Sequence, residues 1–243
     1  MKGEIAIEVI NLSKSFRLPH DNRYTLKQKL LYFAKQNSYE TFTVLNDISF
    51  SINKGDFFGI IGRNGTGKST LLKILAGIYS PDKGKVITNG EISPFLELGV
   101  GFSPDLSGRD NIFLNGIILG LTKKEIKRKF DEIVAFSELE KFIDQKLRNY
   151  SSGMFVRLAF SIAIFANKEI LLMDEVLAVG DIYFKEKCLN ELNKLKQAGR
   201  TIIFISHDMK TIQEHCTKAM LLRKGKIAAF GDPITVIGTY TAK

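Results

Sequence analysis

Apolar residues follow several different spacings along this 243-residue chain. They alternate over residues 4–10, and a second strand-like pattern covers residues 43–61 and ends in the continuous run Phe57–Ile61. Two further apolar runs lie at residues 169–173 and 201–205. Continuous runs of this length predict strands that are buried on both faces, because such strands show no polar alternation.

Helical patterns separate these predicted strands. They cover residues 69–75, a segment from Tyr150 to about Ala166, and residues 183–197, where Gly199 is a typical stop residue. A short helix and a hairpin around Lys224-Gly225 follow the last run. The alternation of strands and helices predicts an α/β fold with a mostly parallel sheet covered on both faces.

Residues 108–149 carry a longer helical pattern. Thr122 and Glu125 have the spacing of a capping box, and apolar residues follow on one helical face. Ser137 and Glu140 repeat this spacing, which predicts a second helix start. We therefore expect a helical subdomain, at about residues 105–166, inserted into a single α/β domain.

Composition and charge narrow the possible functions only slightly. The hydrophobic fraction is 44%, and no run reaches the ~18 apolar residues that span a bilayer. The N-terminus lacks a signal-peptide pattern, and the two cysteines have no metal-ligand spacing. The net charge of +9 suits nucleic acid, anionic lipid or nucleotide phosphate, but acidic residues interrupt the basic ones, so no nucleic acid partner is expected.

The segment Gly62–Ser69 (GRNGTGKS) fits the phosphate-loop pattern G-x-x-x-x-G-K-[ST] between a predicted strand and a predicted helix. Glycines let backbone amides converge on an oxyanion, and the helix N-terminus adds a partial positive charge. Lys68 is expected to reach the β- and γ-phosphates, and Ser69 to ligate Mg²⁺. This motif predicts binding of a nucleoside triphosphate.

Two adjacent carboxylates, Asp174 and Glu175, end the apolar run that begins at Ile170. Asp174 can hold Mg²⁺ through its waters, and Glu175 can orient the attacking water. Phosphoryl transfer needs little beyond such positioning and charge stabilisation. The alternative is an acidic surface turn.

The segment Tyr150–Met154 (YSSGM) precedes an amphipathic helix and the acid pair. Alone, Ser151 or Ser152 would be an ordinary N-cap. Together with the phosphate loop, this order resembles the signature segment of ATP-binding cassette (ABC) ATPases, and the resemblance covers nearly the whole chain. It implies a P-loop NTPase fold of the ABC type, with an N-terminal antiparallel β part beside the central sheet.

The resemblance also implies roles for individual residues. Asp181 would be the loop aspartate after the acid strand, and His207 the switch histidine that contacts the γ-phosphate. Contacts to ATP would come from Phe16, stacked on adenine, and from Gly62, Arg63, Asn64, Gly65, Thr66, Gly67, Lys68, Ser69 and Thr70. The signature residues Ser151, Ser152, Gly153 and Met154 would contact ATP held by a second subunit, which implies a head-to-tail homodimer.

The signature departs from the usual LSGGQ at Tyr150, Ser152 and Met154, and it is similar to that of bacterial polysaccharide exporters. The segments GRNGTGKST, LELGVGF, GRDNI and DEVLAVGD also match that branch. The branch implies ATP-driven export of a lipid-linked O-antigen, teichoic acid or capsule chain through two copies of a separate permease, at the cytoplasmic face of the inner or plasma membrane.

An insertion at about residues 20–38 has the pattern of a basic amphipathic helix, with Leu26, Leu30, Phe33 and Ala34 on one predicted face. It is expected to lie at the membrane interface near the permease, or to pack on its own domain. Residues 235–243 are too few for the C-terminal carbohydrate-binding domain of some members. Either the exporter does not need that domain or the chain is a piece of a longer one.

The stretch Glu91–Phe102 (EISPFLELGVGF) combines a short apolar strand with Pro94, Gly99 and Gly101. The family usually has a glutamine after this strand, and that position falls on Glu97. Glu97, Leu98 and Gly99 are therefore expected to couple ATP hydrolysis to the permease, and Glu97 to ligate Mg²⁺ or mainly to contact the permease. Other functions considered are an ABC ATPase acting on nucleic acid or ribosomes, an ABC subunit for another substrate, and a regulatory module, which the intact Glu175 and His207 disfavour.

Overall fold

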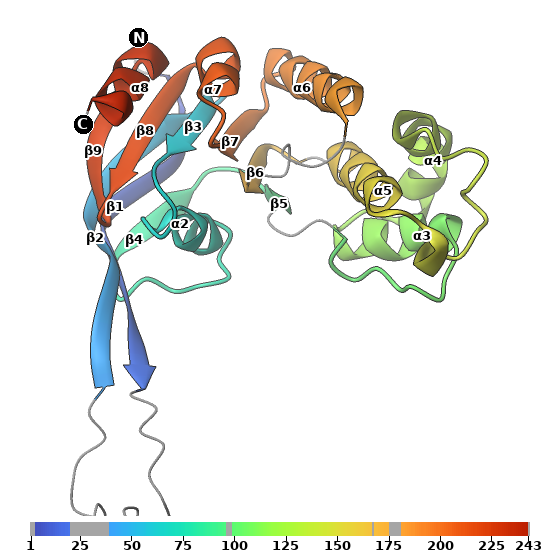
Figure 1. Cartoon of the computed structure of the whole chain (residues 1–243), viewed down its shortest axis with the longest axis horizontal. Coiled ribbons are helices and arrows are strands. Elements are labelled where there is room, and N and C mark those ends of the chain that lie inside the picture. The colour runs from blue at the N-terminus through green and yellow to red at the C-terminus, as the bar shows by residue number, and fades with distance from the viewer. Residues whose placement is uncertain (1–2, 20–38, 96–98, 167, 175–180, 243) are drawn as a thin grey trace, which may run out of the picture.

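A computed structural model describes residues 3–19, 39–95, 99–166, 168–174 and 181–242. Its central sheet has six strands in the order β5-β6-β7-β3-β8-β9 (Figure 1). Their bounds are β3 Phe57–Ile61, β5 Ile92–Phe95, β6 Ile170–Asp174, β7 Thr201–Ile205, β8 Lys218–Arg223 and β9 Lys226–Gly231. All neighbouring pairs are parallel except β8 and β9, which form the expected hairpin. The predicted α/β class with a mostly parallel sheet is confirmed.

A smaller antiparallel sheet has the order β2-β1-β4, with β1 at Ile5–Pro19, β2 at Tyr39–Asn53 and β4 at Lys83–Thr88. The single strand-like pattern over residues 43–61 is divided into β2 and β3, because the chain turns at Gly55, where φ is +76°. Strand β1 is longer than its apolar alternation predicts, since β2 pairs with it as far as Pro19. The paired ends of the two strands project from the body of the molecule (Figure 1).

Helices cover both faces of the central sheet. They are α2 Lys68–Leu75, α6 Ile182–Gln197, α7 Met209–His215 and α8 Pro233–Thr241. The sequence patterns did not predict α8, which begins at the N-cap Asp232 and buries Val236 against the sheet.

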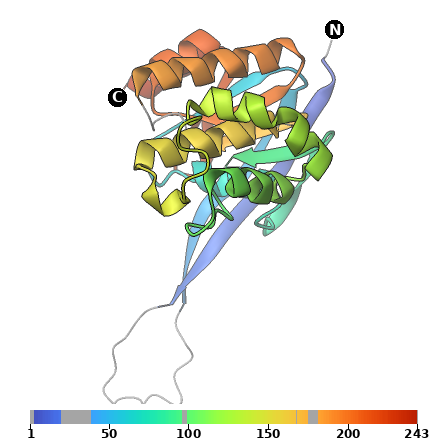
Figure 2. The ribbon, with the colours of Figure 1, turned by 90° about the vertical axis from the view of Figure 1, so that its right-hand side faces the viewer.

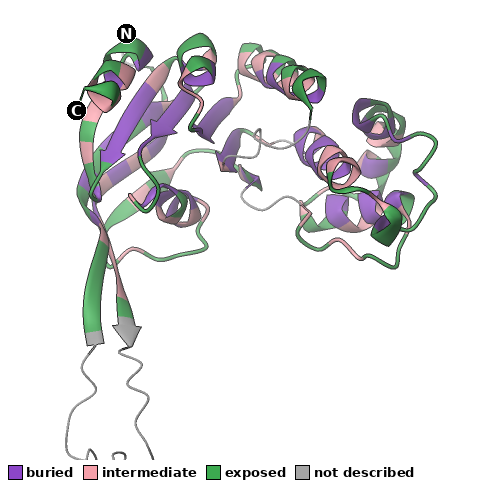
Figure 3. Cartoon of the chain, viewed as in Figure 1, coloured by how far each residue is buried: buried purple, intermediate pink, exposed green. Residues whose placement is uncertain are grey.

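Strands β3 and β7, in the middle of the central sheet, are buried throughout (Figure 3). Alternate residues of each central strand enter different cores. Phe57 and Ile61 of β3 pack with α6, α7 and α8, whereas Phe58 and Ile60 pack with α2 and the antiparallel sheet. Successive side chains of a strand point to opposite faces, so a continuous apolar run supplies both layers. This is why the strands over residues 57–61, 170–174 and 201–205 were predictable.

A helical part with its own core lies at one end of the molecule, beyond edge strand β5 (Figures 1 and 2). It contains α3 Gly108–Ile118, α4 Lys123–Ser137, the short 3-10 helix η1 Leu147–Asn149, and α5 Ser152–Phe165. The capping box of Thr122 and Glu125 is confirmed. None of the helices in the described residues is both long and apolar enough to cross a membrane.

The predicted helix start at Ser137 is wrong. Ser137 is the last residue of α4, and its hydroxyl donates back to the Val134 carbonyl at 2.8 Å. Glu138 then takes a left-handed conformation with φ of +59° and ends the helix. A serine hydroxyl can bond to either a preceding carbonyl or a following amide, so its spacing to Glu140 did not decide between the two ends.

The segment between β5 and α3 is fastened by a buried asparagine. The Asn111 side chain accepts from the Ser103 amide at 2.8 Å and donates to the carbonyls of Ser103 and Ser107 at 3.0 and 2.8 Å. Asn111 is fully buried, so water cannot replace these partners.

We therefore predict that Asn111→Ala lowers the free energy of unfolding by about 1–3 kcal/mol, measured by urea denaturation. Asn190→Ala, at an exposed position on α6, is the control and is expected to change it by less than about 0.5 kcal/mol. Equal midpoints for both variants would contradict the fastening role.

Candidate nucleotide-binding site

The phosphate-loop segment joins the carboxyl end of β3 to the N-terminus of α2. Gly67 is the N-cap of α2 and has a φ of +101°. A Cβ atom there would lie 2.9 Å from Leu45 Cδ2 and 3.0 Å from the Val44 carbonyl oxygen. Glycine is therefore required both by the backbone conformation and by the close approach of β2.

Lys68 is buried, with 5% of its surface exposed. Its ammonium group donates to the carbonyl oxygens of Gly62 at 2.9 Å and Arg63 at 3.1 Å. Thr66 also donates to the Arg63 carbonyl, at 2.9 Å. The loop is thus folded around its own lysine, which brings a positive charge to the N-terminus of α2.

A hollow of about 630 Å³ lies against this loop. The predicted residues that line it are Asn64, Gly65, Gly67, Lys68, Ser69, Thr70 and Asp174. Gly62, Arg63 and Thr66 are not among the lining residues, and they hold the loop by the hydrogen bonds given above.

Asp174 reaches the hollow because of strand pairing. β6 and β7 align Asp174 with Ile205, and β7 and β3 align Ile205 with Ile60. The carboxyl ends of three parallel strands therefore meet beside the phosphate loop, the usual place for ligands in open α/β sheets. Glu175, the predicted partner of Asp174, lies outside the described residues.

Ser69 and Asp174 are the oxygen donors expected for Mg²⁺, and both line the hollow. Hydroxyl and carboxylate oxygens suit this ion, which commonly takes its other ligands from substrate phosphates and water. The described residues contain no cluster of three or more His, Cys, Asp or Glu side chains that would bind a metal without such help. The donor set therefore fits magnesium bound together with a nucleotide.

His207 is exposed just after β7. The following residue, Asp208, caps α7 and accepts from Lys185 Nζ of α6 at 2.8 Å. The Lys185 hydrogen bond, with smaller contributions from Thr211, lowers the pKa of Asp208 to about 2. Asp208 and Lys185 fix the turn that presents His207. The sequence analysis did not single them out, although Asp208 has the ordinary N-cap pattern.

The predicted adenine-stacking residue lies close to the hollow but does not line it. Phe16 packs edge-on against Tyr79, with ring centroids 5.8 Å apart. Its cross-strand partner Phe42 does line the hollow and is 52% exposed. Phe42 is a candidate that sequence reasoning missed, because the pairing of β1 with β2 brings it to this place.

The signature residues occupy the N-terminus of α5, in the helical part. Ser151 is the N-cap, and its hydroxyl accepts from the Met154 amide at 3.2 Å. Ser152, Gly153 and Met154 form the first turn. None of these residues is among the described residues that line the hollow at the phosphate loop. Asp181 caps α6 and accepts from the Phe184 amide at 2.9 Å.

The expected coupling segment is described only from Gly99 onward, and Glu97 and Leu98 lie outside the described residues. Gly99 has a φ of +77°, and a Cβ atom there would lie 2.4 Å from the Phe155 ring. Phe155 also packs edge-on against Phe102, with centroids 5.1 Å apart. Gly99 and Phe102 thus lie closely against α5, the helix that the signature residues begin.

The family model described as ABC transporter matches residues 45–178, which contain the phosphate loop, the signature and the acid pair. The chain belongs to the ABC transporter family. The ATP-binding cassette of this family binds and hydrolyses ATP, as the sequence predicted.

Relatives place the chain more narrowly. It is 39% identical to an O-antigen export system ATP-binding protein of Klebsiella pneumoniae, covering 98% of both chains. A Myxococcus xanthus protein of the same description is 45% identical over 97% of this chain, which spans only 55% of that relative. A teichoic acids export ATP-binding protein of Staphylococcus haemolyticus is 38% identical, over 97% of this chain and 88% of its own length. The predicted exporter branch is confirmed.

Solved structures confirm the fold. A dimeric post-hydrolysis state of an ATP-binding cassette bound to ADP and Pi has a TM-score of 0.75. The two chains are 21% identical, and the match covers 93% of this chain and 98% of that one.

The Asp208 pKa gives a pH prediction. Its folded pKa of about 2 lies below the ordinary 3.8, so its contribution to stability is present above about pH 4 and is lost as the pH falls toward 2. We predict that wild type is more stable than Asp208→Asn at pH 6, and that this difference in the free energy of unfolding shrinks between pH 4 and pH 2. Urea denaturation at several pH values tests this, and a constant difference would contradict it.

Proposed function

We propose that this chain is the ATP-hydrolysing subunit that powers export of a polysaccharide, of the O-antigen, teichoic acid or capsule type, through a separate membrane permease. The observation that carries the proposal is the likeness, over 98% of both chains, to an O-antigen export ATP-binding protein. The subunit would act at the cytoplasmic face of the inner or plasma membrane, on a lipid-linked chain.

The geometry of the phosphate loop supports the assignment of Lys68 and Ser69 to ATP and Mg²⁺, and the other contacts are assigned from the family resemblance. Lys68 and the N-terminus of α2 stabilise the negative charge of the β- and γ-phosphates. Ser69 and Asp174 would hold Mg²⁺, which would neutralise charge on the phosphate oxygens. Glu175 orients the attacking water, and His207 contacts the γ-phosphate. Phe16 is assigned to adenine, with Phe42 as the second aromatic residue at this site.

A complete site requires two copies of the chain. The Ser151 hydroxyl accepts from Met154 and keeps its own proton, so it can still donate to a phosphate. Because Ser151, Ser152, Gly153 and Met154 do not line their own chain's hollow, we assign them to ATP held by the partner subunit. Asp181 is assigned as the aspartate of the loop that follows the acid strand β6 and leads into α6.

An apolar hollow of about 480 Å³ supports the permease assignment. It lies between α2, β5 and the helical part, and its lining includes Gly99 and the exposed side chains of Ile78, Val100 and Ile118. Exposed apolar patches of this kind mark protein interaction sites. We assign Glu97, Leu98 and Gly99 to contact with the permease, and Glu97 alternatively to Mg²⁺. Two copies of the permease would match the two cassettes.

Binding and hydrolysis of ATP are separable by two variants. Lys68→Ala is expected to abolish tight ATP binding, because the buried ammonium is lost from the loop. Glu175→Gln is expected to retain binding but to slow hydrolysis by several orders of magnitude. Equilibrium binding of a fluorescent ATP analogue and phosphate release measure the two effects. Wild-type turnover in Glu175→Gln would refute the assignment of that carboxylate.

The export function is tested in cells that lack the gene. Wild type is expected to restore surface polysaccharide, whereas Lys68→Ala is expected to leave the lipid-linked chain inside. Surface glycan is measured by gel staining and by labelling of intact cells, with Asn190→Ala as the matched control. Normal surface glycan in cells that carry only Lys68→Ala would refute the proposal.

A further inference from the structure

Four charged side chains join the helical part to α6. Glu138, which ends α4, pairs with Arg157 of α5 at 2.5 Å and with Lys187 of α6 at 2.8 Å. Arg157 also pairs with Asp181, the N-cap of α6. We call Glu138, Arg157, Asp181 and Lys187 the Glu138 cluster. It links three helices by ion pairs in which Glu138 and Arg157 each have two partners.

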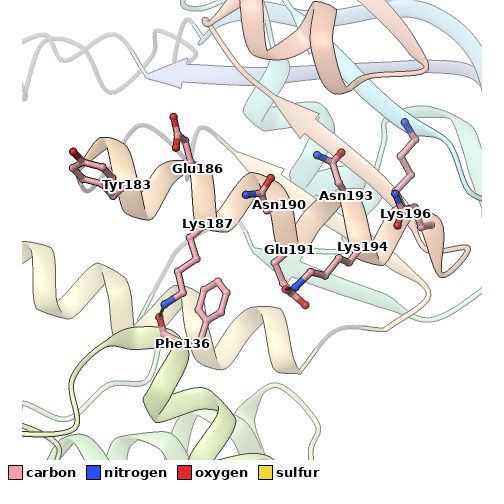
Figure 4. Close-up of a pocket in the computed structure, with 10 residues that line it drawn as sticks. Phe136, Tyr183, Glu186, Lys187, Asn190, Glu191, Asn193, Lys194 and Lys196 are labelled. Carbon is pink, nitrogen blue, oxygen red and sulfur yellow. Dashed lines mark hydrogen bonds and ion pairs between the residues drawn. The ribbon is translucent and has the colours of Figure 1, made fainter.

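Three aromatic rings pack together next to the cluster, and two of them contact its cations. Phe136, Phe160 and Phe184, one from each of the three helices, lie with ring centroids 5.9–6.3 Å apart. The Arg157 guanidinium lies 4.9 Å from the Phe184 centroid. Lys187 reaches from α6 to the Phe136 carbonyl at 2.9 Å (Figure 4). These contacts restrict where the two cations can lie.

The backbone of Glu138 indicates that its side chain is needed. Its φ of +59° is left-handed, a conformation that costs an L-residue about 1–2 kcal/mol and that glycine adopts readily. Helices commonly end with glycine at such a position. We infer that the two ion pairs of the Glu138 side chain offset the cost of its left-handed backbone.

The cluster connects the signature helix to Asp181, which is a member of the cluster and a residue of the proposed nucleotide site. Arg157 is on the same helix as the N-cap Ser151, about 9 Å along its axis. Asp181 begins α6 directly after the segment that follows the acid pair. A change in how Arg157 is held would therefore change the direction of the signature end of α5 relative to Asp181.

We propose that Glu138 is a positioning residue for ATP hydrolysis: by holding Arg157 and Lys187 it fixes the signature end of α5 relative to Asp181. This inference rests on the proposed function, in which the signature contacts ATP of the partner subunit. The hydrogen bond from Lys187, and then that from Arg157, lowers the pKa of Glu138, so the carboxylate is ionised at neutral pH.

The test is Glu138→Gln, which keeps the size of the side chain and removes its charge. Arg157 and Lys187 then lose their shared counter-charge, and the signature helix is less firmly directed. We expect kcat to fall by about tenfold, equivalent to about 1.4 kcal/mol. The affinity for a fluorescent ATP analogue is expected to stay within about twofold, because the cluster contributes no side chain to the hollow at the phosphate loop.

Two further variants separate positioning from folding. Glu138→Gly relieves the left-handed backbone but also removes the carboxylate, so it is expected to lose as much kcat as Glu138→Gln while keeping a melting temperature at least as high. Glu186→Gln is the matched control, an exposed glutamate on α6 beside the cluster (Figure 4). It is expected to keep wild-type kcat.

The proposal is overturned if Glu138→Gln keeps wild-type kcat, if Glu138→Gly regains it, or if Glu186→Gln loses as much. It is also overturned if kcat, ATP affinity and melting temperature fall together in Glu138→Gln, since that pattern is a folding defect. Failure of the proposed function is recognised separately. In that case wild-type protein would either not hydrolyse ATP or hydrolyse it no faster than Glu175→Gln does.

Discussion

The parallel pairing of β3, β6 and β7 is the constraint on which the nucleotide site depends. It brings the phosphate loop, Asp174 and the turn at His207 to one edge of the sheet, although more than one hundred residues separate the first from the last. The strands are buried on both faces, so a shift of one residue in register would move each side chain into the opposite core, disrupt the packing of both, and displace the acid from the loop. Stability and function thus require the same register.

The helical part is stabilised mainly by contacts among its own helices. Its own core lets α3, α4 and α5 hold together as a unit beyond β5. Phe136 of α4 and Phe160 of α5 also enter the core between the central sheet and α6, so the unit is joined to the rest of the chain by apolar packing and by further contacts. Gly99 against Phe155 is one, and the Glu138 cluster is another. In the proposed function this unit carries the signature, so these connections are where movement of the signature and events at the acid strand would be linked.

Charge at the site is placed by backbone groups as much as by side chains. Lys68 is held by two carbonyls of its own loop, and Ser151 by an amide of its own helix. Asp208 is fixed by Lys185, a residue of another helix. The proposed phosphate contacts are therefore positioned before any ligand arrives, which lowers the entropic cost of binding.

The sequence by itself determined the buried strands, the phosphate loop, the capping box at Thr122 and the family, because these depend on local periodicity and on short motifs. It did not determine the helix end at Ser137, the helix α8, the place of Phe42 in the hollow or the ion pairs of Glu138. The end at Ser137 depends on which of two local partners its hydroxyl bonds, and the hydroxyl bonds the Val134 carbonyl. The other features depend on partners far away in the chain. Phe42 needed the register of β1 with β2, and Glu138 needed α5 and α6 beside it. Only the tertiary structure supplies these distant partners.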